Sequence, residues 1–239
     1  AGLVALVLVA IFARLMNYEI KRDEQLYVPP ALLLEQYGLY ADFFYNHVPG
    51  SAWLFHAVKD VLETSYLLLA SRLAVFGAWL FFAGSVAWVS YALTRSAVFT
   101  LFCVLLILTN DAFLTVTGMT ATNNLLPLPF AYQGLGLFIF GVSGNRGNPV
   151  AFGAGGLLLG LAATIKASAI GFIPAAALAA FLLPARLSFL SRLRRVVFPL
   201  ALGGVVGALP VLLYLAADPE LFLAHVVGFH TGPHVTYWA

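Results

Sequence analysis

Two adjacent carboxylates, Asp23 and Glu24, follow the first apolar run of the chain and stand beside Arg22. A carboxylate pair at a partly dehydrated site can accept a proton from an attacking hydroxyl or hold a divalent cation, because neighbouring acids resist joint ionisation. The alternative is a solvated cluster of charges next to a membrane, which is the more common meaning of a charge run. The dipeptide leaves both interpretations open.

The segment around this pair, residues 17–50, is the most polar part of the chain, with five carboxylates and five tyrosines between two apolar runs. Residues 25–37 mix leucine and valine with glutamine and glutamate, which predicts an amphipathic helix in the membrane interface, entered through a Pro-Pro pair. Residues 38–50 then turn the chain back toward the membrane. We therefore expect polar chemistry at the mouth of a membrane bundle.

The composition points to an integral membrane protein. Hydrophobic residues make up 62% of the chain and charged residues 9%, whereas soluble domains carry roughly 25% charged residues. A net charge of +2 and the absence of a basic face argue against nucleic-acid binding. The single cysteine, Cys103, lies in an apolar run and predicts neither a disulfide nor a CxxC metal site.

Seven apolar segments predict membrane-spanning helices, because a span needs about 20 apolar residues. They cover residues 1–16, 71–93, 97–110, 120–142, 149–165, 168–184 and 196–216. The stretch 49–70 carries charges at its middle, which favours a helix along the membrane surface. The predicted fold is all-α, a polytopic bundle with juxtamembrane amphipathic helices in a first outer loop, 17–70. The chain forms one domain, 1–239, which we expect to be incomplete at both ends.

Charge along the chain predicts the orientation. With a cytoplasmic N-terminus, the inner loops carry six arginines and no acid, and all ten acids fall outside. The positive-inside rule favours this topology, and the strongest contribution is the basic cluster at 186–195. The inner arginines are Arg95, Arg146, Arg186, Arg192, Arg194 and Arg195. The prediction is a multi-pass protein of a bacterial plasma membrane with its active site on the outer face.

Two further regions carry candidate residues. Lys166 is a lone cation at the end of a span, where it either binds a phosphate or extends to the interface. His230 and His234 have a spacing found in zinc sites, but Gly232-Pro233 between them argues against a continuous helix. We therefore predict no metal site there, and expect the segment to form an outer loop that shapes a binding site.

The first loop resembles the C-type (GT-C) glycosyltransferases. The shared order is Asp-Glu, a tyrosine, an interfacial helix and then G-x-Y-x-D-F-F-Y-N-x-x-P, which this chain carries from Gly38 to Pro49. The span with Gly160, Leu161 and Lys166 is similar to the G-L-x-x-x-x-K span of bacterial members. These polytopic enzymes include protein O-mannosyltransferases and lipid A aminoarabinose transferases. They move a sugar from a polyprenyl-phosphate carrier to an acceptor on the outer face.

The resemblance implies roles for individual residues. Asp23 matches the acid that activates or orients the acceptor, Glu24 is its neighbour, and Asp111 stands where the family often has a second acid. His47 stands where many relatives carry a lysine that binds the carrier phosphate. The further phosphate-binding candidates are Lys166, Arg22, Tyr45 and His230. The implied partners are a polyprenyl-phosphate-linked sugar, a lipid, glycan or protein acceptor, and membrane lipid. A requirement for a divalent cation stays open.

Two other classes of function compete with this hypothesis. A transporter of a lipid-linked substrate would place its binding residues near the bilayer midplane and often show inverted repeats. Here the acids gather at one face and no repeat is visible, which favours the transferase. An accessory subunit of a membrane complex that kept a transferase-like fold is the second alternative, because fold does not secure function.

Overall fold

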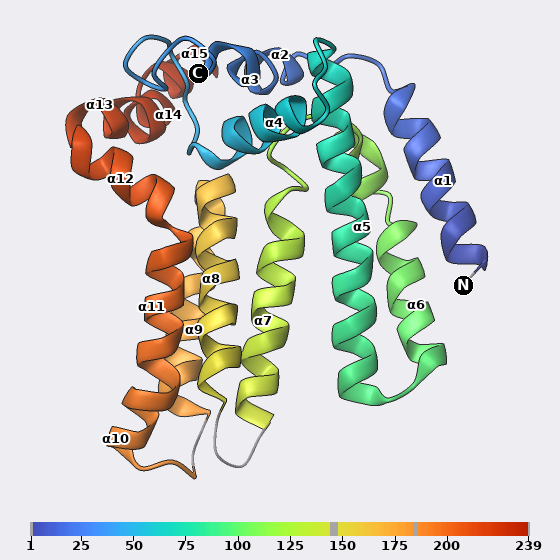
Figure 1. The fold of residues 1–239 in the computed structure, drawn as a ribbon, viewed down its shortest axis with the longest axis vertical. Coiled ribbons are helices and arrows are strands. Elements are labelled where there is room, and N and C mark those ends of the chain that lie inside the picture. The colour runs from blue at the N-terminus through green and yellow to red at the C-terminus, as the bar shows by residue number, and fades with distance from the viewer. Residues whose placement is uncertain (1, 144–147, 184–185, 239) are drawn as a thin grey trace.

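The computed structural model describes residues 2–143, 148–183 and 186–238, and within these ranges it contains helices and loops but no strand. Long helices form a bundle, and a layer of short helices lies across one end of it (Figure 1). The prediction of an all-α fold is confirmed. The described elements are α1(Gly2–Met16), α2(Glu24–Tyr27), α3(Pro30–Leu33), α4(Gly50–Val61), α5(Leu67–Thr94), α6(Ala97–Leu108), η1(Phe113–Thr117), α7(Pro127–Ser143), α8(Pro149–Ile165), η2(Ala167–Gly171), α9(Phe172–Leu182), α10(Phe189–Arg192), η3(Leu193–Val197), α11(Phe198–Gly207), α12(Leu209–Ala217), α13(Pro219–Leu223), η4(Ala224–Gly228), α14(Phe229–Thr231) and α15(Pro233–Trp238).

The apolar segments of the sequence become helices, and two of the changes in their bounds affect the residues near the first loop. Helix α5 begins earlier than the predicted span 71–93, so that Arg72 lies in its second turn. Helix α7 begins at Pro127, later than the predicted start at 120. A proline fits the first position of a helix because its missing N–H would have no partner there. Residues 118–126 are thereby left largely irregular and free to reach the first loop.

Few of the described helices are by themselves long enough to span a membrane. Within the described residues, α5 is long and apolar enough to cross a membrane. The helices Phe189–Gly207 and Leu209–Ala217 pass the same test when they are joined, with a bend of 64° between them. Helix α12 accordingly leaves the axis of α11 near one end of the bundle (Figure 1).

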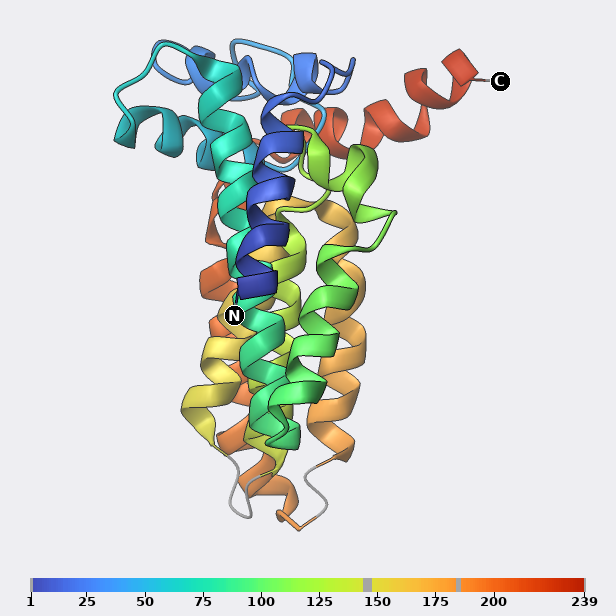
Figure 2. The same cartoon turned by 90° about the vertical axis from the view of Figure 1, so that its right-hand side faces the viewer.

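The first loop forms the layer across the end of the bundle. The predicted amphipathic helix over 25–37 is wrong in its length, because two single turns, α2 and α3, take its place. Pro29 precedes α3 and Pro30 occupies its first turn, so the two prolines separate the turns rather than open one long helix. Helix α4 crosses the end of the bundle, and the C-terminal helices lie beside this layer and project to one side of it (Figures 1 and 2).

Helices α8 and α11 pack with their backbones in direct contact. A Cβ atom added at Gly156 would lie 2.0 Å from the carbonyl oxygen of Leu200, and one at Gly203 would lie 2.0 Å from that of Gly153. Glycines at a four-residue spacing allow such an approach, because no side chain separates the two helices. This contact fixes α8, and with it the position of Lys166 directly after its last residue.

Acidic side chains occupy one end of the bundle, and a group of arginines occupies the other. Arg95 lies between α5 and α6, while Arg186 and the arginines of α10 and η3 lie at the same end. Arg146 falls outside the described residues. The ten acids belong to the first loop, α4, the α6–η1 connection and the start of α13, all of which lie at the opposite end (Figure 1).

Candidate functional site

A polar cavity of about 300 Å³ lies at the acidic end of the bundle. Its wall combines four regions that are far apart in the sequence: the first loop, the segment before α7, the residues that follow α8 and the C-terminal segment. The lining residues are Tyr27, Asn46, His47, Val48, Asn123, Lys166, Ala167, Ser168, Val226 and His230. Three of the five predicted phosphate-binding residues, Lys166, His47 and His230, therefore share one cavity.

The end of α8 positions Lys166. This residue follows Ile165 with extended backbone angles, so the helix stops and the side chain turns toward the first loop. Its Nζ donates a hydrogen bond to Asn124 Oδ1 at 2.5 Å. Burial lowers the pKa of Lys166. No carboxylate of the described residues forms an ion pair with it, so its charge is available to a bound anion.

His47 is held as a neutral imidazole. Its ring stacks on Tyr27 with the ring centroids 4.5 Å apart, and the Tyr27 hydroxyl lies 3.5 Å from Nδ1. Burial lowers the pKa of His47 to about 4, with further contributions from His230 and Lys166. Burial also raises the pKa of Tyr27, helped by Tyr45 and by the Asp23 charge. At neutral pH both groups are uncharged hydrogen-bond donors.

The C-terminal segment supplies a further wall. His230 Nε2 lies 2.9 Å from the carbonyl oxygen of Asn46, and a carbonyl only accepts, so Nε2 carries the proton. The His230 ring lies 5.7 Å from that of His47, centroid to centroid. Nearby, His225 Nδ1 accepts a hydrogen bond from the Tyr45 backbone N–H at 3.3 Å. These contacts hold the C-terminal segment against the first loop and form this side of the cavity.

The cavity suits an anion of the size of a phosphate group. One lysine, two imidazoles, a phenol and two carboxamides line it, and no carboxylate does. Charged and neutral N–H and O–H donors converging on one space bind phosphate oxygens well. The same set of groups does not fit a divalent cation, which prefers carboxylate and other oxygen ligands.

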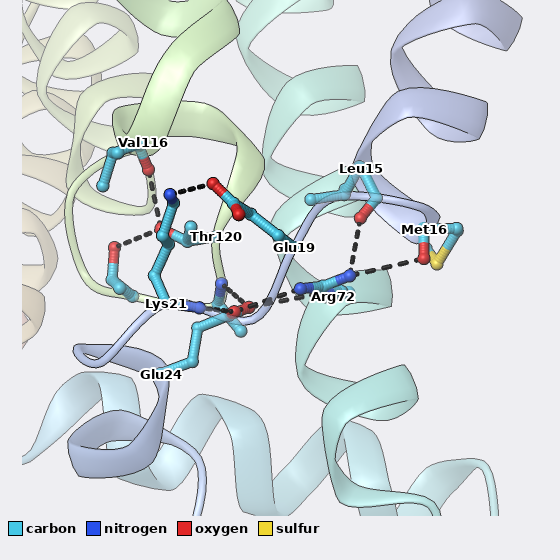
Figure 3. A network of polar contacts seen from close by, with 10 residues as sticks. Leu15, Met16, Glu19, Lys21, Glu24, Arg72, Val116 and Thr120 are labelled. Atoms are coloured by element: carbon cyan, nitrogen blue, oxygen red, sulfur yellow. Dashed lines mark hydrogen bonds and ion pairs between the residues drawn. The ribbon is translucent and has the colours of Figure 1, made fainter.

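Glu24 lies outside this cavity, in a closed network of its own (Figure 3). The side chain is 2% exposed and pairs with Arg72, which is 4% exposed. Arg72 Nε and Nη2 donate to the two carboxylate oxygens at 3.1 and 3.0 Å. The backbone N–H groups of Ala121 and Lys21 complete the set at 2.8 and 3.1 Å. With four donors in place, Glu24 belongs to the scaffold and has no free lone pair directed at a substrate.

The same network joins three parts of the chain. Arg72 Nη1 also donates to the carbonyl oxygens of Leu15 and Met16, which terminate α1 (Figure 3). Glu24 thus ties the first loop to α1, to α5 and to the segment before α7. Asp23 is the residue directly before this anchor, so its backbone position is fixed while its side chain remains exposed.

The other predicted site residues are dispersed. Asp23 lies one helical turn before Tyr27, whose backbone N–H donates to the Asp23 carbonyl oxygen at 3.2 Å, and its charge helps to raise the pKa of Tyr27. Tyr45 is buried behind the wall, where its hydroxyl lies 2.7 Å from Ser51 Oγ. Arg22 and Asp111 are exposed and do not line the cavity.

Sequence reasoning missed several residues that the structure brings to this end of the bundle. Asn123 lines the cavity, is 2% exposed, and its Oδ1 has no hydrogen-bond partner. Asn124 holds Lys166, and Arg72 holds Glu24. A signal was present in the sequence, since Asn123-Asn124 is a polar pair inside an apolar stretch and Arg72 is an ionisable residue within a predicted span.

The terminal histidines do not form a metal site in the described part of the chain. Helix α14 ends at Thr231 and α15 begins at Pro233, so Gly232 interrupts the helix between His230 and His234. Among the described residues, no group of three or more His, Cys, Asp or Glu side chains is placed to hold a metal ion. Comparisons with protein-family models, curated proteins and solved structures find no match to this chain.

Proposed function

We propose that the protein is a polytopic membrane enzyme that transfers a sugar from a polyprenyl-phosphate carrier to an acceptor. The observation that carries the proposal is the cavity without carboxylates, in which Lys166, His47 and His230 converge at one end of an apolar helical bundle. An anionic headgroup would bind there, with its lipid tail among the helices. Asp23, whose charge raises the pKa of Tyr27 in the cavity wall, would supply a base beside it.

The membrane part of the proposal rests on the helices and the charges. Helix α5 has the length of a span, and the shorter apolar helices run alongside it (Figure 1). In a cell, neighbouring helices and local thinning of the bilayer accommodate short spans. The arginine-rich end would face the cytoplasm by the positive-inside rule. The cavity would then open on the outer face.

The proposed reaction is a single displacement. An acceptor hydroxyl gives its proton to Asp23 while its oxygen attacks the anomeric carbon of the sugar. The bond between that carbon and the phosphate oxygen breaks, and the phosphate leaves with the electron pair. A new glycosidic bond and a polyprenyl monophosphate are the products.

The cavity would stabilise the leaving group. A phosphodiester carries one negative charge and the departing monophosphate gains a second, so positive charge and N–H donors lower the barrier most in a site shielded from water. Lys166 supplies the charge, and the neutral His47 supplies an N–H donor. The second charge also favours protonation of His47, because a nearby anion opposes the burial that lowers its pKa.

The test compares Asp23→Asn with Asp42→Asn in the full-length protein, reconstituted with a lipid-linked sugar donor. Asp42 is an exposed acid of the same loop that accepts a hydrogen bond from the Gly38 N–H, and asparagine preserves that contact. Losing a general base lowers kcat by about 100- to 10,000-fold. We expect this for Asp23→Asn and no change for Asp42→Asn. Undiminished transfer by Asp23→Asn removes Asp23 from the base role.

One observation favours a second function, the transport of a lipid-linked phosphate. The bend of 64° between α11 and α12 resembles the broken helices that transporters use at their binding sites. Vesicle assays separate the two functions. A transporter moves the carrier across the bilayer with its glycosidic bond intact, whereas the proposed transferase releases polyprenyl monophosphate in proportion to glycosylated acceptor.

A further inference from the structure

The end of the bundle far from the cavity carries arginines among exposed apolar side chains. Helix α10 and η3 lie at this end, away from the layer of short helices (Figures 1 and 2). Arg194 and Arg195 of η3 are exposed. Phe189 and Leu190 of α10 are 68% and 56% exposed, and Phe198 at the start of α11 is 65% exposed. Positive charge and apolar surface therefore adjoin each other along one short segment, 189–198.

Packing determines which side chains of this segment face outward. Val196 is fully buried against the bundle. Arg192 donates hydrogen bonds to the carbonyl oxygens of Phe181 and Leu187, which ties the segment to the end of α9. Arg194 lies two residues before Val196, so it stands on the opposite side of the helix. Its exposure follows from the burial of Val196.

The positive charge of this end has no acidic counterpart nearby. Among the described residues, all ten acids lie at the opposite end of the bundle (Figure 1). The three lysines of the chain, Lys21, Lys59 and Lys166, lie at that acidic end as well, so the basic residues near α10 are arginines alone. A guanidinium binds two phosphate oxygens through parallel N–H groups, whereas a lysine acts as a point charge.

The direction of the helix sets the depth that the Arg194 guanidinium reaches. The helix that begins with α10 runs from this end into the bundle (Figure 1). Side chains of a helix lean toward its N-terminus, so Arg194 extends over the turn that holds Leu190, toward the end of the bundle. Phe198 lies one turn, or about 6 Å, further into the bundle. Arg194 thus reaches headgroup depth while Phe198 lies at the depth of the acyl chains.

We propose that segment 189–198 binds an anionic phospholipid of the cytoplasmic leaflet, with the lipid phosphate at the Arg194 guanidinium and an acyl chain along Phe198. Phe189 and Leu190 lie in the interface beside the headgroup. A nucleic acid would satisfy the positive charge but would leave the apolar side chains in water. A phospholipid satisfies both, because its phosphate and its acyl chains belong to one molecule. The assignment goes beyond the proposed function and shares only its membrane part.

The test is native mass spectrometry of the full-length protein, released from detergent after titration with phosphatidylglycerol or with phosphatidylcholine of the same acyl chains. Arg194→Gln removes the charge, and Arg194→Lys keeps the charge but loses the planar pair of N–H donors. Arg14→Gln is the matched control, because Arg14 is an exposed arginine in the last turn of α1, at the acidic end. All three substitutions are at exposed positions, and circular dichroism checks that the helices are retained.

We expect the wild type to retain phosphatidylglycerol in preference to phosphatidylcholine. Arg194→Gln should bind phosphatidylglycerol about five-fold more weakly, which is the contribution of one basic residue near an anionic membrane surface. Arg194→Lys should fall between that variant and the wild type. Arg14→Gln should bind as the wild type does, and phosphatidylcholine binding should stay the same throughout.

Equal binding of the two lipids by the wild type overturns the proposal, as does an equal loss of phosphatidylglycerol in Arg194→Gln and Arg14→Gln. Binding by Arg194→Lys at the wild-type level also overturns it, since charge alone then attracts the lipid and no guanidinium holds the phosphate. These outcomes leave the proposed transfer reaction standing, because its cavity lies at the other end of the bundle.

Discussion

Two clusters of charged residues lie at the same end of this molecule and are built in opposite ways. In one, Glu24 and Arg72 are both buried and every carboxylate oxygen has two donors. In the other, Lys166 is half-buried with one amide partner, beside a neutral His47 and an orphan oxygen of Asn123. The first cluster is complete without a ligand, and the second is not. A buried charge whose hydrogen-bond partners all come from the protein stabilises the fold, whereas a polar group that lacks such partners is available to bind a ligand.

The largest expected effect comes from removing one partner of the buried Glu24–Arg72 ion pair. Arg72→Ala leaves Glu24 buried without its cation, and breaking a buried ion pair in this way costs about 3–5 kcal/mol. We expect loss of the folded protein in a thermal unfolding assay monitored by size-exclusion chromatography. The double variant Glu24→Gln with Arg72→Met removes both charges and should recover part of the loss. An Arg72→Ala protein as stable as wild type would mean that Glu24 and Arg72 do not form a buried ion pair.

A substitution at Lys166 should lower ligand affinity without lowering the stability of the fold. Lys166→Gln removes a cation that burial destabilises, so stability should stay level or rise. Hydrogen bonds to charged groups contribute about 1.5–3 kcal/mol, so the affinity for an isoprenyl phosphate should fall by about 10- to 100-fold. Thermal unfolding and phosphate binding, measured on the same preparation, check the two directions. A fall in stability to match the fall in affinity would make Lys166 a structural residue like Arg72.

The pH dependence of stability sharpens the difference further. The pKa of His47 is about 4 in the folded protein and about 6.5 in the unfolded chain. The unfolded state therefore binds the proton first, and stability is lost as the pH falls from 6.5 to 4. The loss reaches about 2–3 kcal/mol. Chemical unfolding of wild type and His47→Gln across this range tests it, since the variant should lose less. A bound phosphate should reduce the loss by favouring the protonated ring.

The smallest expected effect tests the close packing of α8 against α11, which positions Lys166. Gly156→Ala places a methyl group where the Leu200 carbonyl lies, whereas Gly153→Ala would meet its nearest atom at 3.7 Å. Overpacking of this kind costs about 1–3 kcal/mol, and the control glycine should tolerate the change. Because α8 carries Lys166 at its end, Gly156→Ala should also weaken phosphate binding. Equal stability of the two variants would show that α8 and α11 approach less closely than described.

Part of the candidate site could be predicted from the sequence. Lys166 is predicted because a lone cation at a span end is unusual against an apolar background, whereas His47 is predicted from its place in the first-loop motif that resembles the GT-C enzymes. Their meeting with His230 in one cavity could not be predicted, since it depends on the C-terminal segment folding back onto the first loop. Likewise Glu24 and Asp23 look equivalent as a dipeptide, and only Arg72, 48 residues away, distinguishes them.

The sequence by itself determined that the protein is helical, where most helices lie, and that its acids gather at the end opposite the arginines of α10 and η3. These properties follow from hydrophobic runs, prolines and charge, which act over a few residues or sum along the chain. Tertiary structure alone decided which charged side chains form ion pairs and which have no oppositely charged partner. A buried carboxylate has no local signature of its partner, because the ion pair and its hydrogen bonds form only when distant segments pack together.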